Sequence, residues 1–299
     1  MSAFSRLKSG HAWALAAVFF WGAMFPVGRF LMERGAMEPS TLAMARYLLA
    51  TPALMLVGCA VHGRAMFPVR PSDWVHMAVL GLVGSSAMAL LLFMAQRQIA
   101  AVNASLLEAY VPIQVMLLEV LGGRRAGLRQ WLSVIAGFVG SMLVLRALDG
   151  SGVALGRLQT GDLLIFLSGL CWSLYTYLGN GLVRRLGGLC FTAWTVFFGG
   201  VWLLLYNLAT GTSMRMPSAV ADWGCVVFLA LCPTAISFFG WNQAQRTISL
   251  STLSFMEYFT PMVAAAVGIA FLGEAITAWQ WLGMAIIIFS AALQTAGDK

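Results

Sequence analysis

Long apolar stretches alternate with short polar connections along the whole chain. Each stretch is continuous and about 20 residues long, the length that an α-helix needs to cross the hydrocarbon core of a bilayer. Transmembrane strands would instead give short segments of alternating polarity. The pattern therefore predicts an all-α integral membrane protein with ten transmembrane helices. They are expected at about residues 11–32, 40–62, 73–96, 100–121, 129–147, 161–182, 190–209, 221–244, 250–272 and 277–296.

The composition indicates the same class of protein. Of the 299 residues, 60% are hydrophobic and 10% are charged, whereas a soluble domain has roughly 45–50% and 25%. A soluble protein with this composition would lack the polar residues that coat a surface in water. Ordinary cytosolic enzymes, disordered chains and secreted disulfide scaffolds are therefore excluded.

Basic residues are distributed unevenly between the two sides of the predicted bundle. With a cytoplasmic N-terminus, 11 of the 18 lysines and arginines fall on the cytoplasmic side and 6 on the other side. This asymmetry predicts a multi-pass protein of the inner membrane with both termini in the cytoplasm. The net charge of +7 is interpreted as this orientation signal, and we expect no nucleic-acid partner because no basic run is longer than a pair.

The second half of the sequence is similar to the first. An offset of 151 residues places Trp21 on Trp172, and an offset of 149 residues places the stretch 95–112 on the stretch 244–261. The chain is therefore predicted to contain two five-helix repeats, residues 1–150 and 151–299. Because five is odd, the second repeat must enter the membrane from the opposite side. Inverted repeats are typical of alternating-access carriers, which hold the substrate near the midplane between the two halves.

Three ionisable residues are predicted to lie inside the membrane, where each is costly and is a candidate for function. Arg46 and Glu108 are expected at a similar depth and to form an ion pair, which would reduce the cost of desolvating both. We take Phe197 as the repeat equivalent of Arg46, so that Glu257 has no such partner. Glu257 is therefore the candidate to bind a substrate ammonium or a proton.

Two alternatives accompany these residues. Glu257 could instead be a structural carboxylate bonded to the neighbouring hydroxyl of Ser254 or Tyr258. Pro112 and Pro261 each follow an intramembrane glutamate by four residues, so each would free the carbonyl of that glutamate and kink the helix. These prolines are predicted to act as hinges, with a static kink as the alternative.

Aromatic and hydroxyl side chains recur at helical spacing on stretches that correspond between the repeats. Such a mixed lining suits an amphipathic organic substrate, although bundle packing or a membrane-interface belt would explain the aromatic residues as well. The predicted substrate-binding residues are Trp21, Phe25, Ser85, Tyr110, Trp172, Tyr175, Ser237, Trp241, Glu257 and Tyr258.

Other chemistry is not indicated by the sequence. The three histidines and five cysteines show no metal-ligand spacing, so we expect no metal and no other cofactor. No phosphate-binding G-x-x-x-x-G-K-[ST] motif occurs, so ATP is not expected to drive the protein directly. A membrane-embedded lipid-modifying enzyme would need a polar catalytic cluster at one surface, which we do not find. A passive channel would not need inverted halves.

The paired motifs resemble a known family. Two five-helix halves, each with Glu-x-x-x-Pro in its fourth helix, are similar to the EamA branch of the drug/metabolite transporter superfamily. The stretch 261–283 (PMVAAAVGIAFLGEAITAWQWLG) is the most similar, whereas the first half lacks its Leu-Gly-Glu turn at Leu121-Gly122-Gly123. The resemblance implies an inner-membrane carrier that exports amino acids or related metabolites, most similar in appearance to the aromatic and neutral amino acid exporters.

The resemblance also leaves alternatives. A multidrug or nucleotide-sugar carrier of the same superfamily is the main one, although phosphates would call for basic residues inside the cavity and Arg46 alone qualifies. We expect the partners to be a small-molecule substrate and the lipid bilayer, and we expect a monomer. Coupling to protons and the direction of transport stay open.

Overall fold

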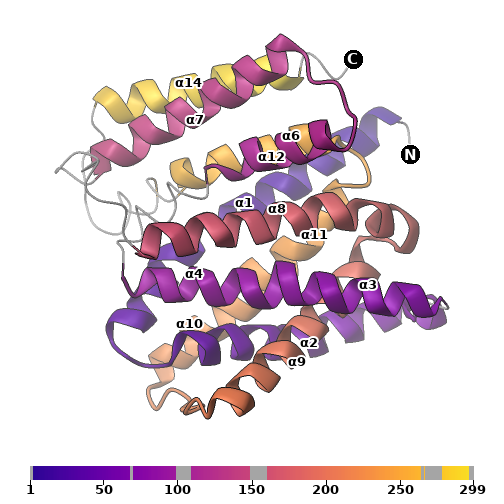
Figure 1. The fold of residues 1–299 in the computed structure, drawn as a ribbon, viewed down its shortest axis with the longest axis vertical. Coiled ribbons are helices and arrows are strands. Elements are labelled where there is room, and N and C mark those ends of the chain that lie inside the picture. Colours follow the sequence, from indigo (N-terminus) through magenta and orange to yellow (C-terminus); the bar gives the residue numbers. More distant parts are fainter. Residues whose placement is uncertain are drawn as a thin grey trace.

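The computed structural model describes residues 3–67, 70–98, 109–148, 160–263, 266 and 278–295. Over these residues the chain forms helices and short connections, with no strand, and the predicted all-α membrane class is confirmed (Figure 1). The long helices are α1 (Ala3–Glu33), α2 (Pro39–His62), α7 (Leu128–Leu148), α8 (Thr160–Leu186), α9 (Gly188–Thr210) and α14 (Ala278–Thr295). The shorter segments are η1 (Gly63–Met66), α3 (Pro71–Gly81), η2 (Leu82–Ala87), α4 (Met88–Gln96), α6 (Val111–Leu121), α10 (Val220–Ala230), η3 (Leu231–Ile236), α11 (Ser237–Ala244), α12 (Leu250–Phe255) and η4 (Met256–Tyr258).

Six of the described helical stretches are long and apolar enough to cross a membrane. They are Gly10–Glu33, Pro39–Met66, Pro71–Gln96, Thr160–Leu186, Gly188–Thr210 and Val220–Ala244. Shorter apolar helices lie at Val111–Leu121, Leu128–Leu143 and Trp281–Leu293. Parts of the predicted helices 100–121 and 250–272 fall outside the described residues, as does Glu108, so the predicted Arg46–Glu108 pair falls outside them too.

The helices run roughly parallel to one axis. The helix α1 begins and α14 ends at one face, on the right of Figure 1, which we call the terminal face; the other is the opposite face. The helices α7 and α14 pack against each other along one side of the bundle, and α2 packs against α9 on another. The interior between them is formed by α1 against α11 and by α4 against α8.

Two stretches expected as continuous α-helices contain a π-helical turn. The turn η2 separates α3 from α4, and η3 separates α10 from α11. The residues Leu231–Ile236 lie 149 residues after Leu82–Ala87, so the two turns fall at corresponding positions in the two halves of the chain. Such turns are rare and are frequently found at functional sites.

Hydroxyl side chains explain how these turns are stabilised. A π-helical turn displaces backbone carbonyls from their usual donors, and Ser or Thr hydroxyls can satisfy them instead. Ser86 donates to the carbonyl of Gly81, and Thr234 donates to the carbonyl of Leu229, in each case five residues back. In η3 the residue Pro233 has no backbone N–H to donate, which favours a break in the regular pattern at that point.

The two predicted hinge prolines occupy different helical positions. Pro112 lies in the first turn of α6, which has Tyr110 as its N-cap residue. A proline fits this position because the first residues of a helix have no intrahelical acceptor for their N–H. On the other side, α12 passes into the 3-10 turn η4, which contains Glu257, before the chain continues helically through Pro261.

Candidate functional site

A cavity inside the bundle encloses about 550 Å³ of space not filled by protein atoms, a volume that includes open solvent at its mouth. Side chains from α1, α2, α4, α6, α8, α11 and η4 reach it, so both halves of the chain contribute. The lining residues are Trp21, Met24, Arg46, Met88, Ala109, Val111, Gly169, Trp172, Phe238, Glu257 and Thr260. One carboxylate and one guanidinium are thus set in a largely apolar wall.

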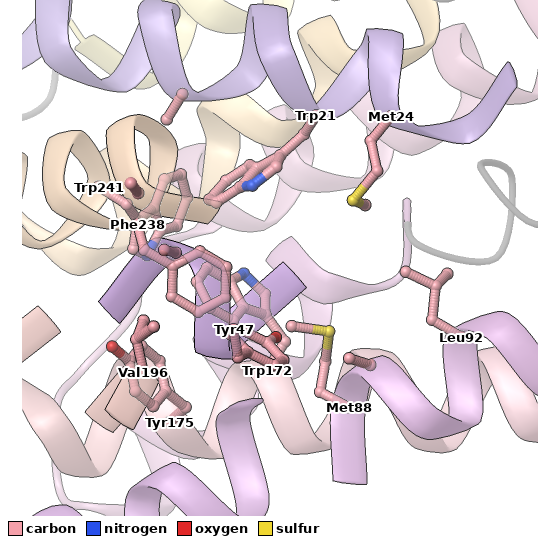
Figure 2. Packing of buried hydrophobic residues seen from close by; sticks show 14 of the residues in the cluster. Trp21, Met24, Tyr47, Met88, Leu92, Trp172, Tyr175, Val196, Phe238 and Trp241 are labelled. Carbon is pink, nitrogen blue, oxygen red and sulfur yellow. The ribbon is translucent and has the colours of Figure 1, made fainter. Parts of the chain in front are cut away.

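Aromatic rings form one wall of the cavity. The rings of Trp21 and Trp172 meet edge to face with centroids 5.2 Å apart, and Phe238 lies 5.1 Å from Trp172. Trp241 lies 5.1 Å from Trp21, and Tyr175 stacks on Trp172 at 5.2 Å. Figure 2 shows these rings grouped together, with Met24 and Met88 beside them. Offset and edge-to-face pairs add about 0.5–1.5 kcal/mol each beyond the area that they bury, so these contacts stabilise the wall.

Glu257 is held in this wall by a tryptophan. Its Oε1 atom accepts a hydrogen bond from the indole Nε1 of Trp172 at 2.7 Å, and the residue is 8% exposed. The two hydroxyls expected as alternative partners donate elsewhere. Ser254 donates to the carbonyl of Ser251, and Tyr258 donates to the carbonyl of Val134. The carboxylate thus lines the cavity, and Trp172, which like Glu257 belongs to the second half of the chain, orients it.

Arg46 lies in the same cavity and is fully buried. Its Nε atom donates to the Oγ1 of Thr234 at 2.9 Å, and one terminal nitrogen lies 3.3 Å from the sulfur of Met24. The guanidinium carbon also lies 5.0 Å from the ring centroid of Tyr47 and 5.5 Å from that of Phe93. A weakly hydrated planar guanidinium is accommodated by such contacts more readily than a strongly hydrated ammonium.

The surroundings of Arg46 have a counterpart in the second half. Around Tyr175, the hydroxyl oxygen lies 3.1 Å from the Oγ1 of Thr195 and accepts from the Nδ2 of Asn242 at 2.9 Å. With the offsets between the halves, Met24, Arg46 and Phe93 correspond to Tyr175, Thr195 and Asn242. In the first half the guanidinium of Arg46 therefore lies against the thioether of Met24 and the ring of Phe93. In the second half the corresponding three residues are neutral and are joined by hydrogen bonds.

This correspondence corrects the assignment of Phe197 as the equivalent of Arg46. The helices α2 and α9 begin at Pro39 and Gly188, so they are related by the same 149-residue offset as the two π-helical turns, and this offset pairs Arg46 with Thr195. The 151-residue offset applies to the first helices of the two halves, α1 and α8, and not to α2 and α9. The contact between Thr195 and Tyr175 mirrors the contact between Arg46 and Met24, which supports the new pairing.

A hydrogen-bonded chain leads from the aromatic wall to the terminal face. Asn242 also donates to Thr192, and it accepts from the Nε2 of Gln245. The Oε1 of Gln245 accepts from Asn180, whose own Oδ1 accepts from Arg184. These polar groups satisfy one another between the aromatic wall and the terminal face.

The structure brings only part of the predicted binding set to the cavity. Trp21, Trp172 and Glu257 line it, and Tyr175 and Trp241 stand behind them in the aromatic wall. The remaining predicted residues are not among the lining residues. Phe25 and Ser85 are buried in the bundle, Ser237 donates to the carbonyl of Cys232, Tyr110 packs against Phe138 and Phe166, and Tyr258 is buried beside Phe255.

Several lining residues were missed by sequence reasoning. Phe238 lines the cavity where Ser237 was expected, and Ser237 donates to the carbonyl of Cys232 instead. Met24, Met88 and Thr260 also line the cavity. Of these, Met88 could have been found, because it is the residue that corresponds to Ser237 in the first half.

Comparisons with known proteins match both halves of the chain to one family. Residues 8–146 and, separately, residues 159–296 match the EamA-like transporter family. The chain is 26% identical over 271 residues to the uncharacterized transporter YyaM of Bacillus subtilis strain 168, a match that covers 90% of this chain and 88% of that protein. It is 24% identical to the uncharacterized inner membrane transporter YedA of Escherichia coli strain K12, over 95% of this chain and 90% of that protein.

A solved crystal structure has the same fold. It superposes on 97% of this chain and 98% of its own with a TM-score of 0.78, at 19% sequence identity. The family and the names of the relatives indicate a membrane transporter.

Proposed function

The chain belongs to the EamA-like transporter family, and from that premise we propose that it is a secondary carrier that exports amino acids or related small amphipathic metabolites. It would work by alternating access, with the cavity opening in turn to the two sides of the membrane. The observation that carries this proposal is that Glu257 and Arg46 line one cavity together with an aromatic wall. A carboxylate can bind an ammonium, a guanidinium can bind a carboxylate, and the rings can contact an apolar side chain.

Two inverted repeats, residues 1–150 and 151–299, would provide the moving parts. The proposal is supported by the two separate family matches, by the corresponding π-helical turns and by the matched trios around Arg46 and Tyr175. Pro112, in the first turn of α6, and Pro261, which follows the 3-10 turn that contains Glu257, would act as the hinges. Two relatives, YedA and YicL of Salmonella typhimurium strain LT2, are named as inner membrane transporters, and the same location with cytoplasmic termini is proposed for this chain.

A nucleotide-sugar substrate is disfavoured by the lining. Two phosphates would need several cationic or N–H donors, and Arg46 is the one basic side chain among the described lining residues. A multidrug cation would use Glu257 and the aromatic wall but would gain nothing from Arg46. The roles of the two charged residues therefore separate these substrates.

The test is uptake of labelled amino acids into proteoliposomes, with competitors and with and without a pH gradient. The competitors are aromatic and aliphatic amino acids, a lipophilic cation and a nucleotide sugar. We expect saturable uptake that amino acids compete, that Glu257→Gln abolishes and that Glu38→Gln, a change at an exposed ion pair, leaves intact. Unchanged uptake in Glu257→Gln, or competition by the nucleotide sugar alone, would overturn the proposal.

A further inference from the structure

Two ion pairs occupy corresponding positions at the two faces of the bundle. Asp73 in the first turn of α3 pairs with Arg185 in the last turn of α8 at the terminal face. Asp222 in the first turn of α10 pairs with Arg34, just after α1, at the opposite face. Asp222 lies 149 residues after Asp73, and Arg185 lies 151 residues after Arg34. The offsets are those that relate the two halves, so the two pairs are copies of one contact.

Each pair joins the first half of the chain to the second. Asp73 and Arg34 belong to the first half, and their partners belong to the second. By contrast, the exposed pair of Arg97 with Glu38 at the opposite face joins two residues of the first half. The corresponding pairs are therefore placed to hold the two halves together, one at each face.

The two copies differ in how tightly they are made. Arg185 binds both oxygens of Asp73, at 2.5 and 2.7 Å, and the side chain of Asp73 is 3% exposed. Arg34 approaches Asp222 only to 3.7 Å, beyond hydrogen-bond distance, and the Oδ1 of Asp222 is buried with no hydrogen-bond partner in the described part of the chain. A buried carboxylate oxygen without a donor is costly, so the opposite-face pair is poised to close.

Other contacts agree with closure at the terminal face. There Ser251 of α12 donates to Glu119 of α6 at 2.5 Å, and Arg124 pairs with the same carboxylate. The hydrogen-bonded chain through Asn242 and Gln245 fills the bundle on the same side of the cavity. The structure thus has its halves fastened at the terminal face, while the copy of that fastening at the opposite face is open.

We propose that the pairs Asp73–Arg185 and Arg34–Asp222 are alternating latches, each closed only when the cavity is shut at its own face. The inference rests on the proposed alternating access. In the state described, the terminal-face latch is closed. In the alternate state Arg34 would close on both oxygens of Asp222, and Arg185 would release Asp73. The bidentate contact between Asp73 and Arg185 would thus be replaced by an equivalent contact between Arg34 and Asp222. Because the two states would each have one such contact, neither would be strongly favoured over the other.

The test measures which face exposes a reporter in the cavity. Met88 lines the cavity, so Met88→Cys is placed in a variant from which the five native cysteines have been removed. The full chain is reconstituted in vesicles, and a membrane-impermeant thiol reagent is applied from one side or the other. The measured quantity is the ratio of the labelling rates from the two faces.

Opposite shifts are expected from the two aspartates. Asp73→Asn should raise labelling from the terminal face about tenfold relative to the opposite face, since a charge-assisted bidentate contact of one state is lost. Asp222→Asn should shift the ratio in the other direction. The exchanged pair Asp73→Arg/Arg185→Asp should restore the wild-type ratio, which a failure to fold would not, and Glu38→Gln serves as the control that leaves the ratio unchanged.

The outcomes separate the latches from alternating access itself. The latches are refuted, and alternating access stands, if both aspartate variants shift the labelling ratio in the same direction. The same conclusion follows if neither variant shifts the ratio while the protein with both latches intact is labelled from both faces. If the reporter is labelled from one face only in every variant, alternating access is refuted, and the latches with it.

Discussion

The hydrogen bond between Trp172 and Glu257 allows a quantitative test of the site. Trp172→Phe keeps most of the aromatic surface in the wall but removes the N–H group that donates to the carboxylate at 2.7 Å. The chain offers a matched control in Trp21, the corresponding residue of the first half. Its indole Nε1 donates to the neutral carbonyl of Pro233 at 2.9 Å. Trp21→Phe thus loses the same donor and the same volume, but no charged acceptor.

The expected energies follow from the nature of the acceptors. A hydrogen bond to a charged group contributes about 1.5–3 kcal/mol in soluble proteins, compared with about 0.5–1.5 kcal/mol between neutral groups. Interhelical bonds in membranes are weaker, about 0.6 kcal/mol on average and about 1.7 kcal/mol at most. We therefore expect a coupling energy between Trp172 and Glu257 of about 1–1.7 kcal/mol. Trp172→Phe should also lower the free energy of unfolding more than Trp21→Phe does.

A double-mutant cycle measures this coupling directly. The free energy of unfolding is determined in mixed micelles for the wild type, for Trp172→Phe, for Glu257→Leu, which removes the acceptor, and for the double variant. Any other contact of Glu257 is lost equally in both variants that carry Glu257→Leu, so it cancels in the cycle. A coupling below about 0.5 kcal/mol, or a Trp21→Phe variant as unstable as Trp172→Phe, would refute a charge-assisted bond at the cavity.

Two further predictions concern packing and the buried network. Gly84→Ala in η2 should lower the free energy of unfolding by about 1–3 kcal/mol, because the added methyl group would meet the ring of Tyr175; Gly224→Ala, which would point into open space, should be neutral in the same unfolding assay. Asn242→Leu should cost about 2 kcal/mol or more, because it removes donors from Tyr175 and Thr192, and a thermal midpoint within error of the wild type would contradict this.

The helices were largely predictable because hydropathy alone determines which segments can span a bilayer. The predicted stretches 40–62 and 221–244 end within about two residues of the observed α2 and α10–α11. Hydropathy carries no information about the hydrogen-bonding pattern within a span, because apolar side chains suit an α-helical turn and a π-helical turn equally. The turns η2 and η3 were therefore missed, although Pro233 and the hydroxyls of Ser86 and Thr234 were visible in the sequence.

The candidate site was predictable to a lesser extent. Trp21, Trp172 and Glu257 were found because motifs matched between the halves, and they line the cavity. The equivalence of Arg46 with Phe197 was wrong because the connection between the first two helices is longer in the first half. It runs from Glu33 to Pro39 there, compared with Leu186 to Gly188 in the second half. Sequence similarity showed that the offset changes, and only the observed helix starts show where.

The matched π-helical turns bear on how this protein can tolerate insertions and deletions. A π-helical turn has i→i+5 hydrogen bonds and so contains one residue more than the corresponding α-helical turn. The extra residue also determines the direction in which the side chains of the following helix point. Deleting one residue from Leu231–Ile236 would rotate α11 by about 100° relative to α10. Phe238 and Trp241 would leave the aromatic wall although neither had been mutated, so chain length at this point is under the same constraint as side-chain identity.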